Sequence, residues 1–148
     1  MEKFQIQIKK LRENAIIPTL GSPLSAGADF YACVDADTTI PPGQTVMIPS
    51  GIALEIPVGC VGLVCARSGL STRRGLAPAN KVGVIDADYR GEITIALHNH
   101  SSAAETISPG ERVAQLLIVP ILSFEFSETD SLSDTERGDG GFGSTGSM

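Results

Sequence analysis

The chain contains no tryptophan, and aromatic residues make up only 5% of its 148 positions. No apolar run approaches the roughly 20 residues of a membrane-spanning helix, and the N-terminus lacks the apolar core of a signal peptide. The cysteines, Cys33, Cys60 and Cys65, are odd in number and lack the two-residue spacing of a metal-binding pair, which argues against a secreted disulfide framework. These absences predict a soluble, cytoplasmic protein with reduced thiols and no membrane partner.

Basic residues are outnumbered by acidic ones. Lysine and arginine number 11 against 17 aspartates and glutamates, so the formal net charge is −6. A chain of that charge repels the phosphates of DNA and RNA, and we do not expect nucleic acid as a partner. A small anionic ligand could still bind where positive side chains gather locally.

Glycine (16) and proline (9) are plentiful, which favours many turns and short strands. Apolar segments between these turns predict strands at 3–11, 29–33, 38–40, 44–50, 51–56, 61–66, 82–85, 92–99, 106–107, 113–119 and 123–126. Residues 82–85 and 92–99 are expected to pair as a hairpin. One helix is expected at 68–74, with Ser68 or Ser71 as its cap and Pro78 as its stop. The pattern predicts an all-β domain over residues 1–126, either a barrel or a double-sheet jelly roll.

Composition changes after the last of these segments. Residues 127–148 are dominated by serine, threonine, aspartate, glutamate and glycine. Such a segment buries too little apolar area to offset the entropy lost on ordering. We expect it to be a flexible, glycine-rich C-terminal arm.

Five short segments in order resemble the motifs of the trimeric dUTPases: 26–30 (AGADF), 67–70 (RSGL), 83–91 (GVIDADYRG), 110–116 (GERVAQL) and 137–146 (RGDGGFGSTG). Departures are Ala66, where many members have proline, and Ala28, often a bulkier residue. The resemblance implies an enzyme that hydrolyses dUTP to dUMP and pyrophosphate, which keeps uracil out of DNA and supplies dUMP for thymidylate synthesis. It also implies a jelly-roll-like β-barrel subunit and a homotrimer with shared active sites. One copy would give the second and fourth motifs, another the third, and another its arm.

The resemblance assigns the chemistry to the first four motifs. Asp86 would orient the water that attacks the α-phosphate and contact the sugar 3′-hydroxyl. Arg67, Ser68 and Gly69 would bind phosphates, since an arginine fork and N–H groups at a helix start suit anions. Gln115 would lie near the attacking water, and Asp29 would support magnesium-bound waters or orient its neighbours. Taken alone, these residues also fit blander roles: a turn aspartate, an exposed arginine, a capping serine, an outward-facing glutamine.

Base and sugar would be recognised around the third motif. The backbone of Val84 and Ile85 would pair with the uracil edge as adenine does, and Asn80 would add an amide. A donor facing the C4 carbonyl rejects cytosine, because two donors left unpaired cost about 1–3 kcal/mol. The Tyr89 ring would pack on deoxyribose and exclude UTP. The resemblance also assigns substrate contacts to Gly83 and Thr94, whereas on their own Asn80 and Tyr89 fit a turn residue and a half-buried aromatic.

The arm and a metal ion would complete the site. By resemblance Arg137 pairs with the γ-phosphate, Phe142 stacks over uracil, and Gly143, Ser144 and Thr145 contact substrate. Mg²⁺ would be held by the triphosphate without direct protein ligands, with a water-mediated contact from Asp29. His98 and His100 alternate on or just past a strand, but two imidazoles without a third ligand are interpreted as structural or surface residues.

Two alternatives remain open at this point. A dCTP deaminase shares several of these motifs, but its glutamate beside the base corresponds to Ala96 in 93–97 (ITIAL). A non-catalytic, jelly-roll nucleotide-binding module would need no intact catalytic motifs, whereas this chain has a candidate at every one.

Overall fold

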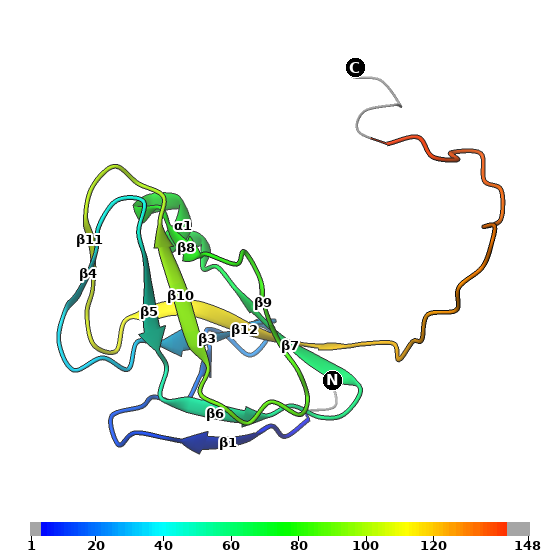
Figure 1. The fold of residues 1–148 in the computed structure, drawn as a ribbon. Coiled ribbons are helices and arrows are strands. Elements are labelled where there is room, and N and C mark those ends of the chain that lie inside the picture. Colours follow the sequence, from blue (N-terminus) through cyan, green and yellow to red (C-terminus); the bar gives the residue numbers. More distant parts are fainter. Residues whose placement is uncertain (1–3, 142–148) are drawn as a thin grey trace.

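The computed structural model describes residues 4–141. Within them the chain forms twelve short β-strands and one helix (Figure 1). The strands are β1 (Gln7–Lys10), β2 (Thr19–Leu20), β3 (Ala28–Tyr31), β4 (Thr38–Ile40), β5 (Thr45–Pro49), β6 (Ile52–Glu55), β7 (Cys60–Cys65), β8 (Leu76–Pro78), β9 (Gly83–Ile85), β10 (Thr94–Asn99), β11 (Glu105–Ile107) and β12 (Arg112–Pro120), and the helix is α1 (Ser68–Arg74).

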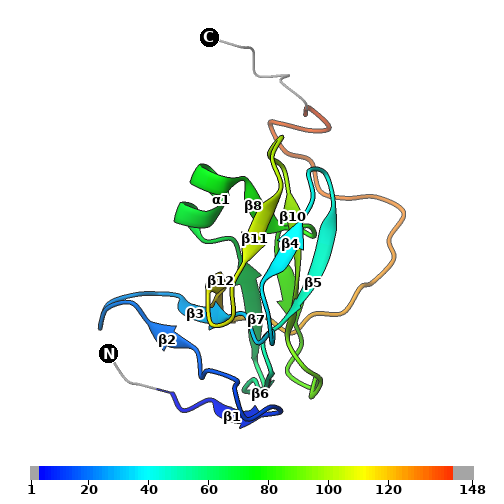
Figure 2. The same cartoon turned by 90° about the vertical axis from the view of Figure 1, so that its left-hand side faces the viewer.

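Long-range antiparallel pairing assembles these strands. The largest sheet has the order β2-β3-β12-β7-β9, and a three-stranded sheet has the order β5-β10-β8. Two further strand pairs are β1-β6, at the bottom of Figure 2, and β11-β4. Phe30, Ile48, Leu97 and Val113 come from different strands and are fully buried together in one core. The predicted all-β jelly roll is confirmed.

Turn chemistry explains why the strands are short. In the segment Pro41-Pro42-Gly43, Gln44 N donates to Pro41 O at 3.1 Å, and Gly43 has φ +70°, which favours glycine. The chain reverses there between β4 and β5, as the sequence predicted.

The predicted hairpin of 82–85 with 92–99 is wrong. β9 pairs with β7, whereas β10 pairs with β5 and β8. The segments are neighbours in sequence but belong to different sheets, because each strand's apolar residues find their partners far along the chain. Strands β2 and β8 were not predicted either, because they are only two and three residues long and too short to show a period.

The helix forms where expected but begins and ends differently. Arg67 is its N-cap residue, and no side-chain cap is present, so the predicted serine cap is wrong. Gly75 ends the helix at φ +66°, with its N–H donating to Leu70 O and Ser71 O. Pro78 lies in β8 instead of stopping the helix.

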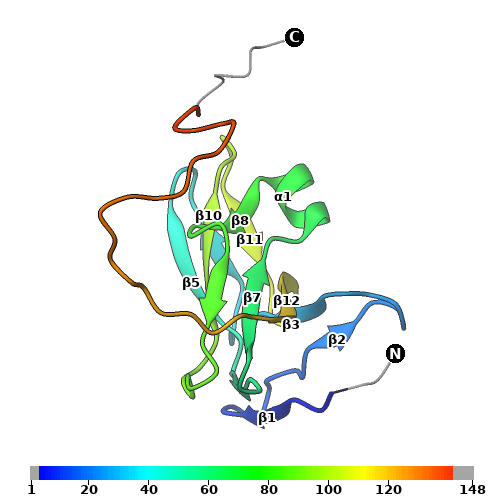
Figure 3. The same ribbon diagram turned by 90° about the vertical axis from the view of Figure 1, so that its right-hand side faces the viewer.

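The chain leaves the domain after β12. Residues 123–126 form no strand, contrary to prediction, and Phe124 and Phe126 are 75% and 95% exposed. Within the described residues, no hydrogen bond or ion pair joins 122–141 to the domain, and the segment runs away from the strands (Figures 1 and 3). It therefore gains no stability from its own domain.

The cysteines are free thiols, as expected. Cys33 is buried, and this burial raises the pKa of its thiol above the ordinary value. No helix in the described part of the chain is long and apolar enough to cross a membrane.

Candidate functional site

A cavity opens where the chain crosses from one sheet to the other and back. β8 lies beside β10, but the tight turn that follows carries the chain to the edge of β7, where β9 forms. In this turn Lys81 has φ +66°, and its N–H donates to Pro78 O at 3.0 Å. Residues 86–93 then lead back to β10. Because β9 and β10 diverge, a space of about 480 Å³ remains between them.

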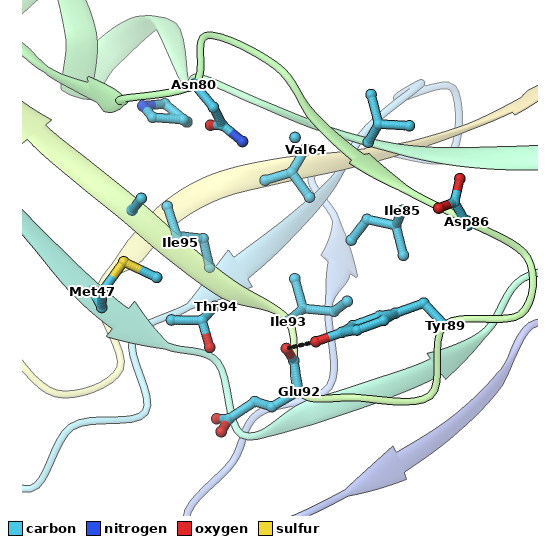
Figure 4. Close-up of a pocket in the computed structure, with 14 residues that line it drawn as sticks. Met47, Val64, Asn80, Ile85, Asp86, Tyr89, Glu92, Ile93, Thr94 and Ile95 are labelled. Carbon is cyan, nitrogen blue, oxygen red and sulfur yellow. Dashed lines mark hydrogen bonds between the residues drawn. The ribbon is translucent and has the colours of Figure 1, made fainter.

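The cavity has an apolar floor and a polar rim (Figure 4). Val64, Ile85, Ile93 and Ile95 form the floor, and all four are buried. The sequence-predicted base, sugar and catalytic residues of this region all line the cavity: Asn80, Gly83, Val84, Ile85, Asp86, Tyr89 and Thr94. An apolar space with a few polar groups at its edge suits a planar heterocycle.

Peptide groups are available along one wall. β9 is the edge strand of its sheet, and only its β7 side is paired in the described residues. A free strand edge presents unpaired N–H and C=O groups in a row. These groups can pair with the polar edge of a base.

Asp86 and Tyr89 lie in the loop that follows β9. The loop is closed by the Tyr89 N–H, which donates to Asp86 O at 3.1 Å. Asp86 is exposed, and its carboxylate makes no hydrogen bond or ion pair within residues 4–141. The Tyr89 hydroxyl donates to Glu92 O at 3.1 Å, which sets the ring along the cavity wall (Figure 4). A free carboxylate thus stands beside a fixed aromatic ring.

A second cluster gathers around Asp29 on β3. Its Oδ1 accepts from Arg67 Nε at 2.7 Å, and its Oδ2 accepts from Arg112 Nη1 at 3.2 Å. The Asp29 side chain is 13% exposed, whereas that of Arg112 is 51% exposed. Asp29 therefore holds two guanidinium groups together, which fits the predicted role of orienting its neighbours. Sequence analysis missed Arg112 as a site residue, although the residue stands in the fourth motif.

Gln115 belongs to the same cluster. It lies opposite Asp29 on β3 and Cys65 on β7, and its Nε2 donates to Ala66 O at 2.8 Å. A Cβ atom on Gly27 would lie 2.5 Å from Gln115 Oε1, so a larger residue there would displace this amide. Ser68 and Gly69 are exposed at the start of α1, next to Arg67.

A set of charged residues holds the far end of α1. Arg74 Nε donates to Glu105 Oε2 at 2.6 Å, and its other nitrogens donate to Glu111 Oε1 and Thr106 O. Burial alone would lower the pKa of Arg74, but the bonds to both glutamates raise it above its ordinary value. The helix that begins with the phosphate-binding candidates is thus fastened to β11 and to the start of β12.

Replacing Arg74 with alanine is expected to lower the free energy of unfolding by about 2 kcal/mol. The value lies between those of surface and buried ion pairs, because the three charged side chains are 22–29% exposed. Denaturant unfolding measures it. The matched control is Arg73→Ala, since Arg73 is exposed and makes no hydrogen bond or ion pair in the described range. Equal stability of the two variants would contradict the expectation.

The cavity beside Asp86 and the cluster around Asp29 lie on opposite faces of one sheet. Val64 lines the cavity, whereas the next residue, Cys65, lines a separate hollow with Asp29 and Gln115. Successive side chains of a strand point to opposite faces. β12 shows the same division, because Leu116 pairs with Val64 and Gln115 with Cys65. The fold therefore separates the predicted base site from the predicted phosphate site.

The arm residues join neither cluster within one chain. Arg137 Nε donates to Gly140 O at 2.8 Å, inside a local turn of the arm. The other predicted arm contacts, Phe142, Gly143, Ser144 and Thr145, lie outside the described residues.

No set of three or more His, Cys, Asp or Glu side chains converges as a metal site in residues 4–141. His98 Nδ1 bonds to Thr45 Oγ1 at 2.9 Å, and its ring centroid lies 4.4 Å from that of His100. The predicted phosphate site presents the guanidinium groups of Arg67 and Arg112, which suit phosphate oxygens rather than a bare metal ion.

Comparison with known proteins identifies relatives over the whole chain. Residues 13–146 match the family model described as dUTPase. The chain is 44% identical to a deoxyuridine 5′-triphosphate nucleotidohydrolase of Syntrophotalea carbinolica and 46% identical to one of Desulfitobacterium hafniense, each match covering 99% of both chains.

Solved structures give the same picture. The dUTPase of Staphylococcus bacteriophage 80alpha with dUpNHpp superimposes with a TM-score of 0.89 at 30% identity, covering 98% of this chain and all of that one. A point mutant of the dUTPase from phage phi11 of S. aureus, described with a structural Mg(II) ion, gives 0.78 at 28% identity over 86% of this chain and 98% of that one.

Proposed function

The chain belongs to the dUTPase family and hydrolyses dUTP, and we propose that it does so at sites that three copies of the chain build together. The observation that carries the proposal is the separation of the two clusters by their own sheet. β9 stands at the edge of that sheet, and β12 lies two strands away, roughly 10 Å at the usual strand spacing. A nucleotide whose base lies on one face needs phosphate ligands from another chain. A closed threefold ring with heterologous contacts brings unlike faces together in this way.

Uracil would enter the cavity between β9 and β10. The apolar floor would bury its ring, the free edge of β9 at Val84 and Ile85 would pair with its carbonyl and N–H groups, and Asn80 would add an amide. Tyr89 would pack against the deoxyribose, with Gly83 and Thr94 completing the walls. Ala96 also lines this cavity and presents only a methyl group. Alanine therefore occupies the position of a deaminase's proton-shuttling glutamate, and Glu92, a glutamate that does line the cavity, is engaged by Gly51 N, which supports hydrolysis over deamination.

Hydrolysis would take place at the rim beside Asp86. Its free carboxylate would orient a water molecule and accept its proton as the water attacks the α-phosphorus. The bond to the bridging oxygen breaks, and pyrophosphate leaves. Arg67, Ser68, Gly69 and Gln115 of a second copy would bind the phosphates, with Asp29 fixing the Arg67 guanidinium.

Magnesium would bind as a complex with the triphosphate of the substrate. The cationic Arg67 and Arg112 fit phosphate oxygens, and the Asp29 carboxylate that pairs with both would accept hydrogen bonds from waters of the bound ion. When bound, the ion supplies charge neutralisation of the phosphates. The side chains of Arg67 and Arg112, oriented by Asp29, would align the triphosphate for in-line attack.

The arm of a third copy would close the site. Phe142 would stack over uracil, Arg137 would pair with the γ-phosphate, and Gly143, Ser144 and Thr145 would add contacts. The absence of bonds between 122–141 and their own domain supports this assignment, because it leaves the segment available to a neighbour.

Mixed trimers test whether sites are shared. Asp86→Asn and Arg67→Ala chains are each expected to be inactive, but after joint refolding in equal amounts, about a quarter of sites combine an intact Asp86 with an intact Arg67 from different copies. Pyrophosphate release from dUTP should recover to that level. Mixing without refolding is the control. A refolded mixture that stays inactive, although both chains co-assemble, would refute shared sites and leave the family's hydrolytic activity untouched.

A further inference from the structure

Tyr89 is held by two hydrogen bonds, one from its backbone and one from its hydroxyl. Its backbone N–H bonds to Asp86 O, and its hydroxyl bonds to Glu92 O three residues further on. The ring is 46% exposed, so one face remains open to the cavity (Figure 4). Its angle in the cavity is set by the residues that it bridges.

The Tyr89 ring lies close against Gly91, which has no side chain. A Cβ atom at this position would lie 2.5 Å from Tyr89 Cζ and 3.0 Å from Cε2, and closer still to the hydroxyl oxygen. The three nearest atoms all belong to Tyr89, and the backbone of Gly91 is not in the positive-φ region. Glycine is therefore needed here for the position of the ring and not for the backbone.

Glu92 holds the acceptor in place. Its Oε1 accepts from Gly51 N at 2.7 Å, and its Oε2 lies 3.8 Å from Arg12 Nη2. The next residue is tied to the same turn, because Ile93 N donates to Ile52 O at 2.8 Å. The carbonyl that receives the Tyr89 hydroxyl is thus anchored to the buried junction between β5 and β6.

We infer that Gly91 and Glu92 are positioning residues that set the discrimination between deoxyribonucleotide and ribonucleotide through the angle of the Tyr89 ring. The inference rests on the proposed function, in which Tyr89 packs against the sugar. A ring pressed into the sugar site leaves no room for a 2′-hydroxyl. A ring that swings away opens that room while the base, the phosphates and Asp86 keep their places.

The test measures kcat/KM for dUTP and for UTP and compares their ratio. Gly91→Ala and Glu92→Ala are each expected to lower the ratio by about tenfold or more, the scale on which one methyl-sized change in a pocket discriminates substrates. Glu92→Gln should keep the wild-type ratio, because its amide oxygen can still accept from Gly51 N. Glu13→Ala is the matched control, since Glu13 is exposed and makes no side-chain hydrogen bond or ion pair in the described residues.

Tyr89→Ala separates the inference from its premise. If this variant keeps the wild-type ratio, the sugar contact proposed for Tyr89 fails. If the dUTP-to-UTP ratio of kcat/KM falls in Tyr89→Ala but stays at the wild-type value in folded Gly91→Ala and Glu92→Ala, only the positioning role fails. Should Glu92→Ala not fold, Gly91→Ala decides alone, because the three atoms nearest to its added methyl all belong to the partly exposed side chain of Tyr89.

Discussion

Asp86→Asn is expected to abolish dUTP hydrolysis while leaving the fold and the substrate affinity nearly unchanged. The Asp86 carboxylate stands exposed at the rim of the cavity and makes no hydrogen bond or ion pair with described residues, so an isosteric amide costs no structural contact. An amide cannot accept the proton of the attacking water. Removing a positioned general base typically costs about 10²–10⁴ in rate, and we expect kcat to fall by at least about a hundredfold.

Two measurements check this expectation. Pyrophosphate release from dUTP with magnesium gives kcat, and calorimetric titration with a non-hydrolysable imido analogue of dUTP gives the affinity. Asp37→Asn is the control, because Asp37 is also an exposed loop aspartate but lies outside both clusters. Wild-type turnover by Asp86→Asn would remove the central residue from the proposed mechanism. A large loss of affinity would instead indicate a role in binding.

Deleting residues 137–148 is expected to have the second-largest effect. Base stacking by Phe142 is worth about 1–3 kcal/mol, and a hydrogen bond from Arg137 to a phosphate about 1.5–3 kcal/mol. Together they correspond to a fall in kcat/KM of about 10²–10⁴. The domain should stay folded, because no hydrogen bond or ion pair joins 122–141 to it, and the proposed threefold assembly is expected to persist.

Circular dichroism and size-exclusion chromatography report on the fold and the assembly, and steady-state kinetics report on the activity. A chain in which 137–148 is replaced by a glycine-serine segment of equal length controls for length alone. Joint refolding of the deleted chain with Asp86→Asn should restore activity, because one copy supplies the carboxylate and the other the arm. Full turnover by the deleted chain would contradict the role of the arm.

Much of the fold follows from local patterns. β7 and β12 carry branched apolar residues in runs that only a strand buries on one or both faces, and Pro41-Pro42-Gly43 specifies its own turn. Sequence periodicity failed to predict strands correctly where a strand forms only if a partner strand lies beside it. Residues 123–126 alternate as a strand should, yet they pair with no sheet edge, and Phe124 and Phe126 are exposed because the chain leaves the domain after β12.

The structure brings several of the predicted site residues together. Asn80, Asp86 and Tyr89 do line one cavity. Arg112 was missed as a site residue, because only the register of β12 against β3, shifted between Arg112 and Ala114, brings its side chain to Asp29. Glu92 was missed because its partner Gly51 is distant in sequence.

The sequence by itself determined the all-β class, the positions of most strands and the short helix, because these depend on periodicity and turn chemistry within a few residues of one another, and resemblance in short motifs supplied the candidate site residues. Only the tertiary structure decided that β9 and β10 separate to open a cavity, and that Asp86 and the Asp29 cluster lie on opposite faces of one sheet. A strand pairs with partners that lie far away in the chain. The register of that pairing decides which face of the sheet each side chain takes, because a shift of one residue moves every side chain to the other face.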